Sequence, residues 1–102
     1  MIIVSTTSDS ELILKKIASI ILDKKLSPCT HIYKIDHSGY IWNNEIVHKE
    51  EFKLEIKTIL SNQSAIKSII KNNHNYNVYE LTSLEIKSLN SDYDNWFKNQ
   101  IA

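Results

Sequence analysis

The feature that most constrains this chain is a pair of long extended stretches joined by a tight turn. Residues 29–42 form the first stretch, about fourteen residues long, and the chain returns along it as far as Thr58. Asn43-Asn44 lies between them, and asparagine is typical of tight turns because it tolerates positive φ. At about 3.3 Å per residue the first strand spans about 45 Å, whereas a domain of this length is about 34 Å across. The hairpin should therefore extend beyond its own core.

An overhanging, apolar, two-stranded ribbon tends to aggregate unless another surface covers it. We expect a second copy of the chain to do so, by pairing between subunits. The alternative is a sharp bend at Gly39, the only glycine, since glycine inside a strand is typical of a bulge or a close backbone approach. Ile32 and Tyr33 are adjacent apolar residues, which also favours a bulge or a two-sided environment near them.

The remaining elements follow from local patterns. Residues 2–6 are short and β-branched, which predicts a buried strand. Ser8, with Glu11 three residues later, has the capping-box pattern and predicts the start of the first helix. Ser61 is expected to cap a second helix with an apolar stripe.

Two more strands and a third helix are expected. Residues 52–57 alternate between apolar and charged, which predicts a strand with one buried face. Residues 78–86 predict a fourth strand. Asn90 or Ser91 should cap a short final helix. Two aromatic residues at helical spacing are expected to dock that helix, Tyr93 and Trp96.

The resulting order is β-α-β-β-α-β-α. Its first six elements predict an α+β fold, a ferredoxin-like βαββαβ sandwich with a long central hairpin and two helices on one face of an antiparallel sheet. A C-terminal helix follows. We expect residues 1–102 to form a single domain, and the hairpin argument predicts that copies of the chain associate.

Charge and cysteine content exclude several classes of partner. Twelve basic residues, all lysine, balance twelve acidic ones, so no global field favours nucleic acid or an anionic membrane. Arginine, the preferred residue for bidentate phosphate contacts, is absent. No apolar run approaches a membrane span, and the N-terminus lacks the features of a signal peptide. A single cysteine fits a reducing compartment, so we expect a cytoplasmic protein that binds neither nucleic acid nor membrane.

Five short motifs occur in a fixed order along the chain. They are Leu26-x-x-Cys29, Ser38-x-Tyr40-x-Trp42, Glu51 ahead of Leu54-x-Ile56-Lys57-Thr58, His74-x-Tyr76-x-Val78-x-Glu80, and Asn90-x-x-Tyr93-x-x-Trp96. In this order and at these separations they resemble the CutA family of divalent-cation tolerance proteins over nearly the whole chain. The chain departs from the family pattern at Asn77, where a glutamate is usual, and at Tyr79, where a proline is usual.

The resemblance implies a ferredoxin-like fold and a homotrimer similar in shape to the PII signalling proteins, with long hairpins that pair between subunits. It also implies a link to tolerance of divalent metals, copper especially. The family is not known as an enzyme family. The sequence agrees, because the neighbouring carboxylates Glu50 and Glu51 point to opposite faces of a strand and no glycine-rich phosphate loop is present.

Four residues are the candidate metal ligands. Cys29 and His31 share one face of a strand, and thiolate with imidazole suits copper. The alternative is a buried thiol that packs as a small hydrophobe beside an exposed histidine. His74 follows a helix C-terminus, where it either binds a ligand or stabilises the helix end. Glu80 is the fourth candidate.

A second set of residues is expected to line an intersubunit cleft or interface. Tyr40 and Trp42 share a strand face and are either interface anchors or cleft walls. Lys57 either holds an anion or forms a cross-strand ion pair. Tyr76 belongs to the same set, whereas the two remaining histidines, His37 and His48, are expected to be solvent-exposed.

The sequence therefore predicts a trimeric divalent-metal tolerance protein, not an enzyme, whose partners are itself and metal ions such as copper. The alternative is a PII-like trimeric signalling or scaffold module that binds a small anion or a partner protein at intersubunit clefts. In that alternative Tyr40, Trp42 and Lys57 carry the function and metal binding is incidental.

Overall fold

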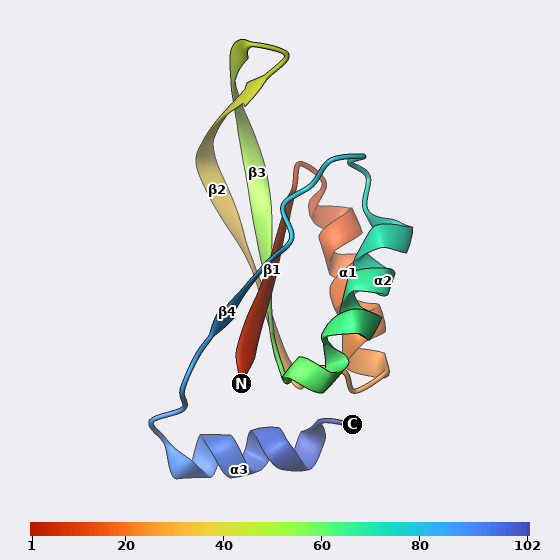
Figure 1. Cartoon of the computed structure of the whole chain (residues 1–102), viewed down its shortest axis with the longest axis vertical. Coiled ribbons are helices and arrows are strands. Elements are labelled where there is room, and N and C mark those ends of the chain that lie inside the picture. Colours follow the sequence, from red (N-terminus) through yellow and green to blue (C-terminus); the bar gives the residue numbers. More distant parts are fainter.

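The computed structural model describes all of residues 1–102, and its elements follow one another in the predicted order (Figure 1). A single 3₁₀ turn, η1, precedes the second helix. The elements are β1 (Ile2–Ser8), α1 (Glu11–Asp23), β2 (Cys29–Trp42), β3 (Glu45–Thr58), η1 (Leu60–Asn62), α2 (Gln63–Asn73), β4 (Thr82–Glu85) and α3 (Ser91–Gln100). No helix is both long enough and apolar enough to cross a membrane.

The four strands form one antiparallel sheet in the order β2-β3-β1-β4. The ladder between β1 and β3 runs from the pair Ile2–Thr58 to the pair Ser8–Phe52. Helices α1 and α2 cover one face of the sheet, and the opposite face carries no helix along its length (Figure 1). This arrangement confirms the predicted ferredoxin-like α+β fold.

The core lies between the sheet and the two helices. Alternation along β3 places Leu54 and Ile56 on the helix side, fully buried, as predicted. They meet an apolar stripe from each helix, and burial of each such side chain contributes about 1.5–3 kcal/mol. The helical contributors are Leu14, Ile17, Ala18, Ile21, Ile66 and Ile70.

The β2–β3 hairpin extends beyond this core, as its length predicted. The chain measures 46 × 27 × 20 Å, and the hairpin tip rises well above the ends of α1 and α2 (Figure 1). Ile41 and Ile46 near the tip are each 74% exposed. Asn43 and Asn44 both have positive φ, 51° and 64°, so the expected tight turn is present.

The strand irregularity occurs at a different place from the one expected. The register of β2 against β3 shifts between Ile35 and Ser38, where β2 holds one more residue than its partner. Ile32 stays in register, and so does Gly39, opposite His48. Both strands continue beyond the shift for several paired residues, so β2 contains a bulge rather than a bend that ends the hairpin.

Of the three predicted helix caps, the one at Asn90 is confirmed, whereas those at Ser8 and Ser61 were wrong. Ser8 is the last residue of β1, because the ladder to β3 continues as far as Phe52. The N-cap of α1 is Ser10, whose hydroxyl accepts a hydrogen bond from the Ile13 amide at 3.2 Å. Ser61 lies inside η1, and α2 begins after Asn62 with no side-chain cap.

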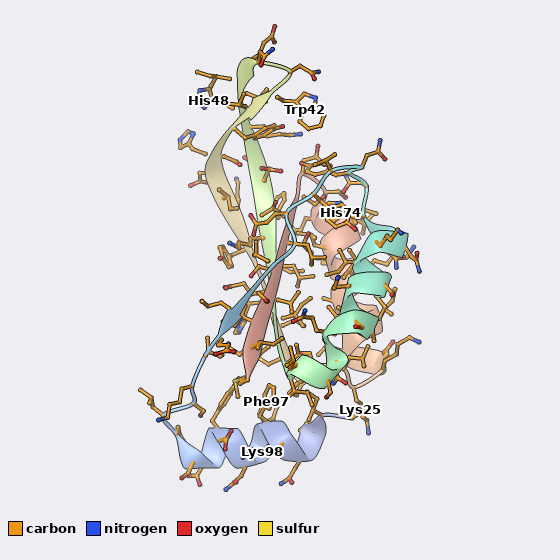
Figure 2. All side chains as sticks on the ribbon, viewed as in Figure 1. Lys25, Trp42, His48, His74, Phe97 and Lys98 are labelled. Carbon is orange, nitrogen blue, oxygen red and sulfur yellow. The ribbon has the colours of Figure 1, made fainter.

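The C-terminal part also differs in detail. The fourth strand covers only Thr82–Glu85, since its partners on β1 are limited to residues 2–5. Asn90 caps α3, with its side chain accepting from two backbone amides. Phe97, 1% exposed, is the main docking residue and points from α3 toward the end of the sheet (Figure 2), whereas Trp96 remains 43% exposed.

The Asn43-Asn44 turn, in which both residues have positive φ, allows a test of the hairpin. Replacing Asn44 by alanine should lower the free energy of unfolding by about 1 kcal/mol, because the short polar side chain of asparagine hydrogen-bonds locally at positive φ and that of alanine cannot. Asn44→Gly should be at least as stable as the parent, because an Asn-Gly turn suits such a hairpin. Urea unfolding at a fixed chain concentration compares the two variants, and an alanine variant as stable as the glycine variant would contradict the turn.

Candidate functional site

The bulge in β2 decides which side chains of the hairpin face the open side of the sheet. Below the bulge, Cys29 and His31 lie on the open face, paired across from Lys57 and Glu55. Strict alternation beyond Ile35 would turn Tyr40 and Trp42 to the helix side. The extra residue restores them to the open face, so both belong to the same surface as the lower half of β2.

A cleft of about 730 Å³ lies on this open face. One wall is the upper part of the β2–β3 hairpin, and the other is the segment 76–80 that leads into β4. Four aromatic side chains line it: Tyr40, Trp42, Tyr76 and Tyr79. Residues far apart in sequence therefore form one concave, aromatic-rich surface, which is typical of a small-molecule site or an interface.

Glu51 lies within this cleft and is only 5% exposed. One carboxylate oxygen accepts a hydrogen bond from the Ser38 hydroxyl at 2.5 Å, and the other accepts from the Tyr76 hydroxyl at 2.7 Å. Burial, together with that hydrogen bond, raises the pKa of Tyr76 to about 12. Tyr76 therefore remains a neutral donor at ordinary pH.

Two lysines line the cleft, and each lies beside an acidic residue. The ammonium of Lys49 is 3.0 Å from the Asp9 carboxylate and 5.2 Å from the centre of the Tyr76 ring. The hydrogen bond to Asp9 raises the pKa of Lys49, and the same bond lowers the pKa of Asp9. Lys53 lies 3.6 Å from Glu80. These pairs are partly exposed, so each contributes little to stability.

Both ring nitrogens of His74 are occupied by backbone groups. Nδ1 accepts a hydrogen bond from the Tyr76 amide at 3.0 Å, and Nε2 lies 2.8 Å from the carbonyl oxygen of Thr7. A carbonyl can only accept, so Nε2 carries the proton and the ring is neutral. The ring stacks on Tyr79 with centroids 4.5 Å apart. Burial lowers the pKa of His74, whose ring lies beside the end of α2 (Figure 2).

Cys29 and His31 come together on the lower open face. The sulfur of Cys29 is 4.0 Å from Nε2 of His31, with Cys29 half-buried and His31 exposed. Tyr93 of α3 lies near Cys29, and its pKa is raised by burial and, to a smaller extent, by the neighbouring Cys29 thiol. His74 and Glu80 do not join this pair, and no group of three or more potential ligands gathers anywhere in the chain.

The other expected site residues are distributed as follows. Tyr40, Trp42 and Tyr76 line the cleft with Glu80, whereas Lys57 lies outside it, across from Cys29. His37 and His48 are exposed, as predicted. Sequence reasoning missed the contribution of Asp9 and Lys49, because residues 40 positions apart in the chain carry no local signal of their pairing.

Comparison with known proteins identifies relatives of this chain. The family model of the CutA1 divalent ion tolerance protein matches residues 2–100. Protein CutA 1, chloroplastic, of Oryza sativa is 36% identical over 85 residues; the match covers 83% of this chain but 48% of the rice protein, so the chain spans about half of that relative. The divalent-cation tolerance protein CutA of Thermus thermophilus is 30% identical, with 94% of this chain and 93% of that protein covered.

Solved structures agree with the observed fold. The Thermus thermophilus divalent cation tolerance protein superposes with a TM-score of 0.90 at 29% identity, over 100% of both chains. A point mutant of CutA1 from Pyrococcus horikoshii superposes with a TM-score of 0.91 at 25% identity, over 100% of this chain and 99% of that chain.

The buried imidazole predicts a pH dependence of stability. The unfolded chain takes up a proton at His74 near pH 6.5, whereas the folded chain does so only at lower pH, because burial disfavours the charged ring and lowers its pKa; a proton on Nδ1 would also displace the Tyr76 amide. This contribution to stability is therefore complete above pH 6.5 and is lost as the pH falls below it. Urea unfolding of the parent between about pH 5 and 8 should show this loss.

His74→Gln should remove that component of the pH dependence, and His37→Gln, at an exposed position, should retain it. The same pH slope in the parent and in His74→Gln would contradict the assignment.

Proposed function

The chain belongs to the CutA1 divalent ion tolerance protein family, and on this premise we propose that it contributes to divalent-cation tolerance by binding the metal ions itself. Copper is the metal that we propose first, because thiolate and imidazole are ligands that copper prefers. The proposed action is binding rather than catalysis. The cytoplasm is the proposed location, although relatives are named as chloroplastic and periplasmic.

The observation that carries the proposal is the Cys29–His31 pair. Its two donor atoms lie 4.0 Å apart on one strand face, and His31 is exposed to incoming ions. A metal that binds both atoms would complete its coordination with water or with groups from another copy of the chain. Two protein ligands make a weak site, which suits a protein that takes up and releases ions rather than holding one permanently.

His74 and Glu80 are weaker candidates in this proposal. His74 would have to break the backbone hydrogen bond of whichever nitrogen bound the metal, with the Tyr76 amide at Nδ1 or the Thr7 carbonyl at Nε2. Glu80 is engaged with Lys53 and with the Thr82 hydroxyl. We therefore place the metal at Cys29 and His31 and assign His74 to the support of segment 74–80.

We further propose that the protein is a homotrimer. The support is the overhanging hairpin, whose exposed apolar residues Ile41, Trp42 and Ile46 lie beyond the core of their own chain. Burial of such a ribbon against another copy would remove both its apolar surface and its unpaired strand edge from water.

A second candidate function is a PII-like module that binds a ligand at the cleft. The 730 Å³ cleft with its aromatic walls favours a ligand or partner site. A small anion fits it less well, because both cleft lysines are paired with carboxylates and Lys57 lies elsewhere.

Metal titration of the purified chain tests the leading proposal. Under reducing conditions, calorimetry with Cu⁺ and Zn²⁺ should show binding that becomes about tenfold weaker or more in Cys29→Ser and in His31→Gln, because each substitution removes a direct ligand. His37→Gln, an exposed histidine of the same strand, is the matched control and should bind as the parent does.

The His74 substitution separates the two ligand assignments. His74→Gln should leave metal affinity unchanged in the folded chain, because its nitrogens are occupied. Loss of affinity in His74→Gln together with unchanged affinity in His31→Gln would move the site away from β2.

The molar mass in solution tests the trimer. Light scattering should give the mass of three chains of 11.9 kDa each. Ile46→Lys at the hairpin tip should shift the population toward smaller species, because a lysine would be buried without a partner. Leu12→Lys, at an exposed leucine of α1, is the control and should leave the mass unchanged. A monomer at every concentration of the parent chain would contradict the proposal.

A further inference from the structure

The charges of this chain balance overall but are unevenly distributed between its two layers. The helix layer, residues 11–25 and 63–73, contains two acidic residues and six lysines. Its net charge is therefore +4, and because the whole chain is neutral the remaining residues carry −4. The lysines are Lys15, Lys16, Lys24, Lys25, Lys67 and Lys71. The balanced composition thus hides a local field over this layer, and such a field attracts anionic partners.

The lysines of the helix layer are exposed, and most of them lack an acidic partner. All six side chains are exposed, because the inner stripes of both helices form the core. Only Lys15 is paired, with Glu11 at 2.8 Å, and α2 contains no acidic residue. Lysines of the hairpin differ, since Lys34, Lys49 and Lys53 each lie beside a carboxylate. The uncompensated positive charge is therefore concentrated on the outer side of α1 and α2.

The outer side of the two helices forms a surface of its own. It lies on the other face of the sheet from Cys29, His31 and the cleft (Figure 1). Leu12 is 77% exposed, takes no part in the core and precedes Lys15 and Lys16 by one turn, so these residues are neighbours on α1. Lys67 and Lys71 are likewise one turn apart on α2. We call the surface made by Leu12, Lys15, Lys16, Lys67 and Lys71 the lysine face.

The composition of the helices decides which anionic partner fits the lysine face. Neither α1 nor α2 contains an arginine or an aromatic residue. Protein interfaces rely on Trp, Tyr and Arg at their centres, and nucleic-acid sites rely on arginine and on aromatic stacking. An anionic lipid surface requires neither, because lysines attract the headgroups as point charges and an exposed leucine can enter the boundary with the acyl chains.

We propose that the lysine face docks reversibly on an anionic lipid surface, with Leu12 entering the headgroup region. Clusters of about four to eight basic residues are typical of surfaces that bind phosphatidylserine, and the helix layer supplies six. The chain lies on the membrane in this proposal and does not cross it. Because the lysine face and the Cys29–His31 pair are on opposite faces of the sheet, the inference is independent of the metal proposal.

Co-sedimentation of the purified chain with lipid vesicles, in a metal chelator, tests the proposal. The probes are phosphatidylcholine vesicles that contain about one third phosphatidylserine, and vesicles of phosphatidylcholine alone. At about 0.1 M salt the chain should bind the anionic vesicles about tenfold more tightly or better. At about 1 M salt this preference should disappear, because the screening length falls from about 10 Å to about 3 Å.

A pair of lysine substitutions locates the docking surface. The double variant Lys67→Gln, Lys71→Gln removes both charges of α2 and should weaken binding to the anionic vesicles by about tenfold. The matched control is Lys87→Gln with Lys98→Gln, which changes the net charge equally but outside the helix layer, at exposed positions. Lys71 and Lys98 each lie in the last turn of a helix, so the two pairs are alike in local structure. The control should bind as the parent does.

A substitution of the leucine tests the apolar part of the contact. Leu12→Ala retains a good helix former at an exposed position and should weaken vesicle binding several-fold, because less apolar surface enters the headgroup region. Circular dichroism and thermal melting verify that each variant is folded. Cys29→Ser, which tests the metal proposal, should bind vesicles as the parent does, so failure of one proposal is distinguishable from failure of the other.

Four results would overturn the inference. They are equal binding to both kinds of vesicle, no binding to either, an equal loss of affinity in the α2 pair and in the control pair, and tighter binding to duplex DNA or to polyglutamate than to the anionic vesicles at the same salt concentration. The last result would assign the lysine face to a nucleic acid or to an acidic protein instead of a membrane.

Discussion

The antiparallel ladder between β1 and β3 is the interaction on which the rest of the structure depends, because it fixes which residues face the helices. Its register pairs Val4 with Ile56 and Thr6 with Leu54, so that the buried apolar side chains of both strands lie on the helix side. A shift of one residue would expose this whole set and bury the lysines and glutamates between them. The helix layer, the open face and the direction of the hairpin all follow from that register.

The bulge in β2 is the second constraint, and it decides the character of the cleft. One extra residue between Ile35 and Ser38 changes the phase of the upper strand relative to the lower one. Tyr40 and Trp42 consequently share a face with Glu51, and Ser38 comes close enough to donate a hydrogen bond to it. Bulges often re-aim side chains beside functional sites, and here the bulge converts the end of a plain hairpin into the wall of an aromatic cleft.

Segment 74–80 supplies the opposite wall, and a network of polar contacts holds it in place. The backbone around His74 is held to β1 through Thr7, the hydroxyl of Tyr76 reaches Glu51, and the hydroxyl of Thr6 donates to the carbonyl of Glu80. Neutral His74 fits this role because one nitrogen donates and the other accepts. The two backbone hydrogen bonds of His74 stabilise segment 74–80 and also occupy the nitrogens that would bind a metal. The side chains of Cys29 and His31 make no such hydrogen bonds to the backbone.

The sequence by itself determined the order of the elements, the fold class, the length of the hairpin and its Asn-Asn turn, because these depend on periodicity and local propensity. It also predicted that Cys29 and His31 share a strand face, since alternation along a strand is a local rule. It failed on the Ser8 cap and on the length of the fourth strand, where pairing to β1 overrode the local pattern. Only the tertiary structure decided that the bulge lies at 35–38, that Lys49 pairs with Asp9, and that Glu51 is buried between Ser38 and Tyr76. Those facts depend on contacts between segments that are far apart in the chain, and such contacts leave no local pattern in the sequence.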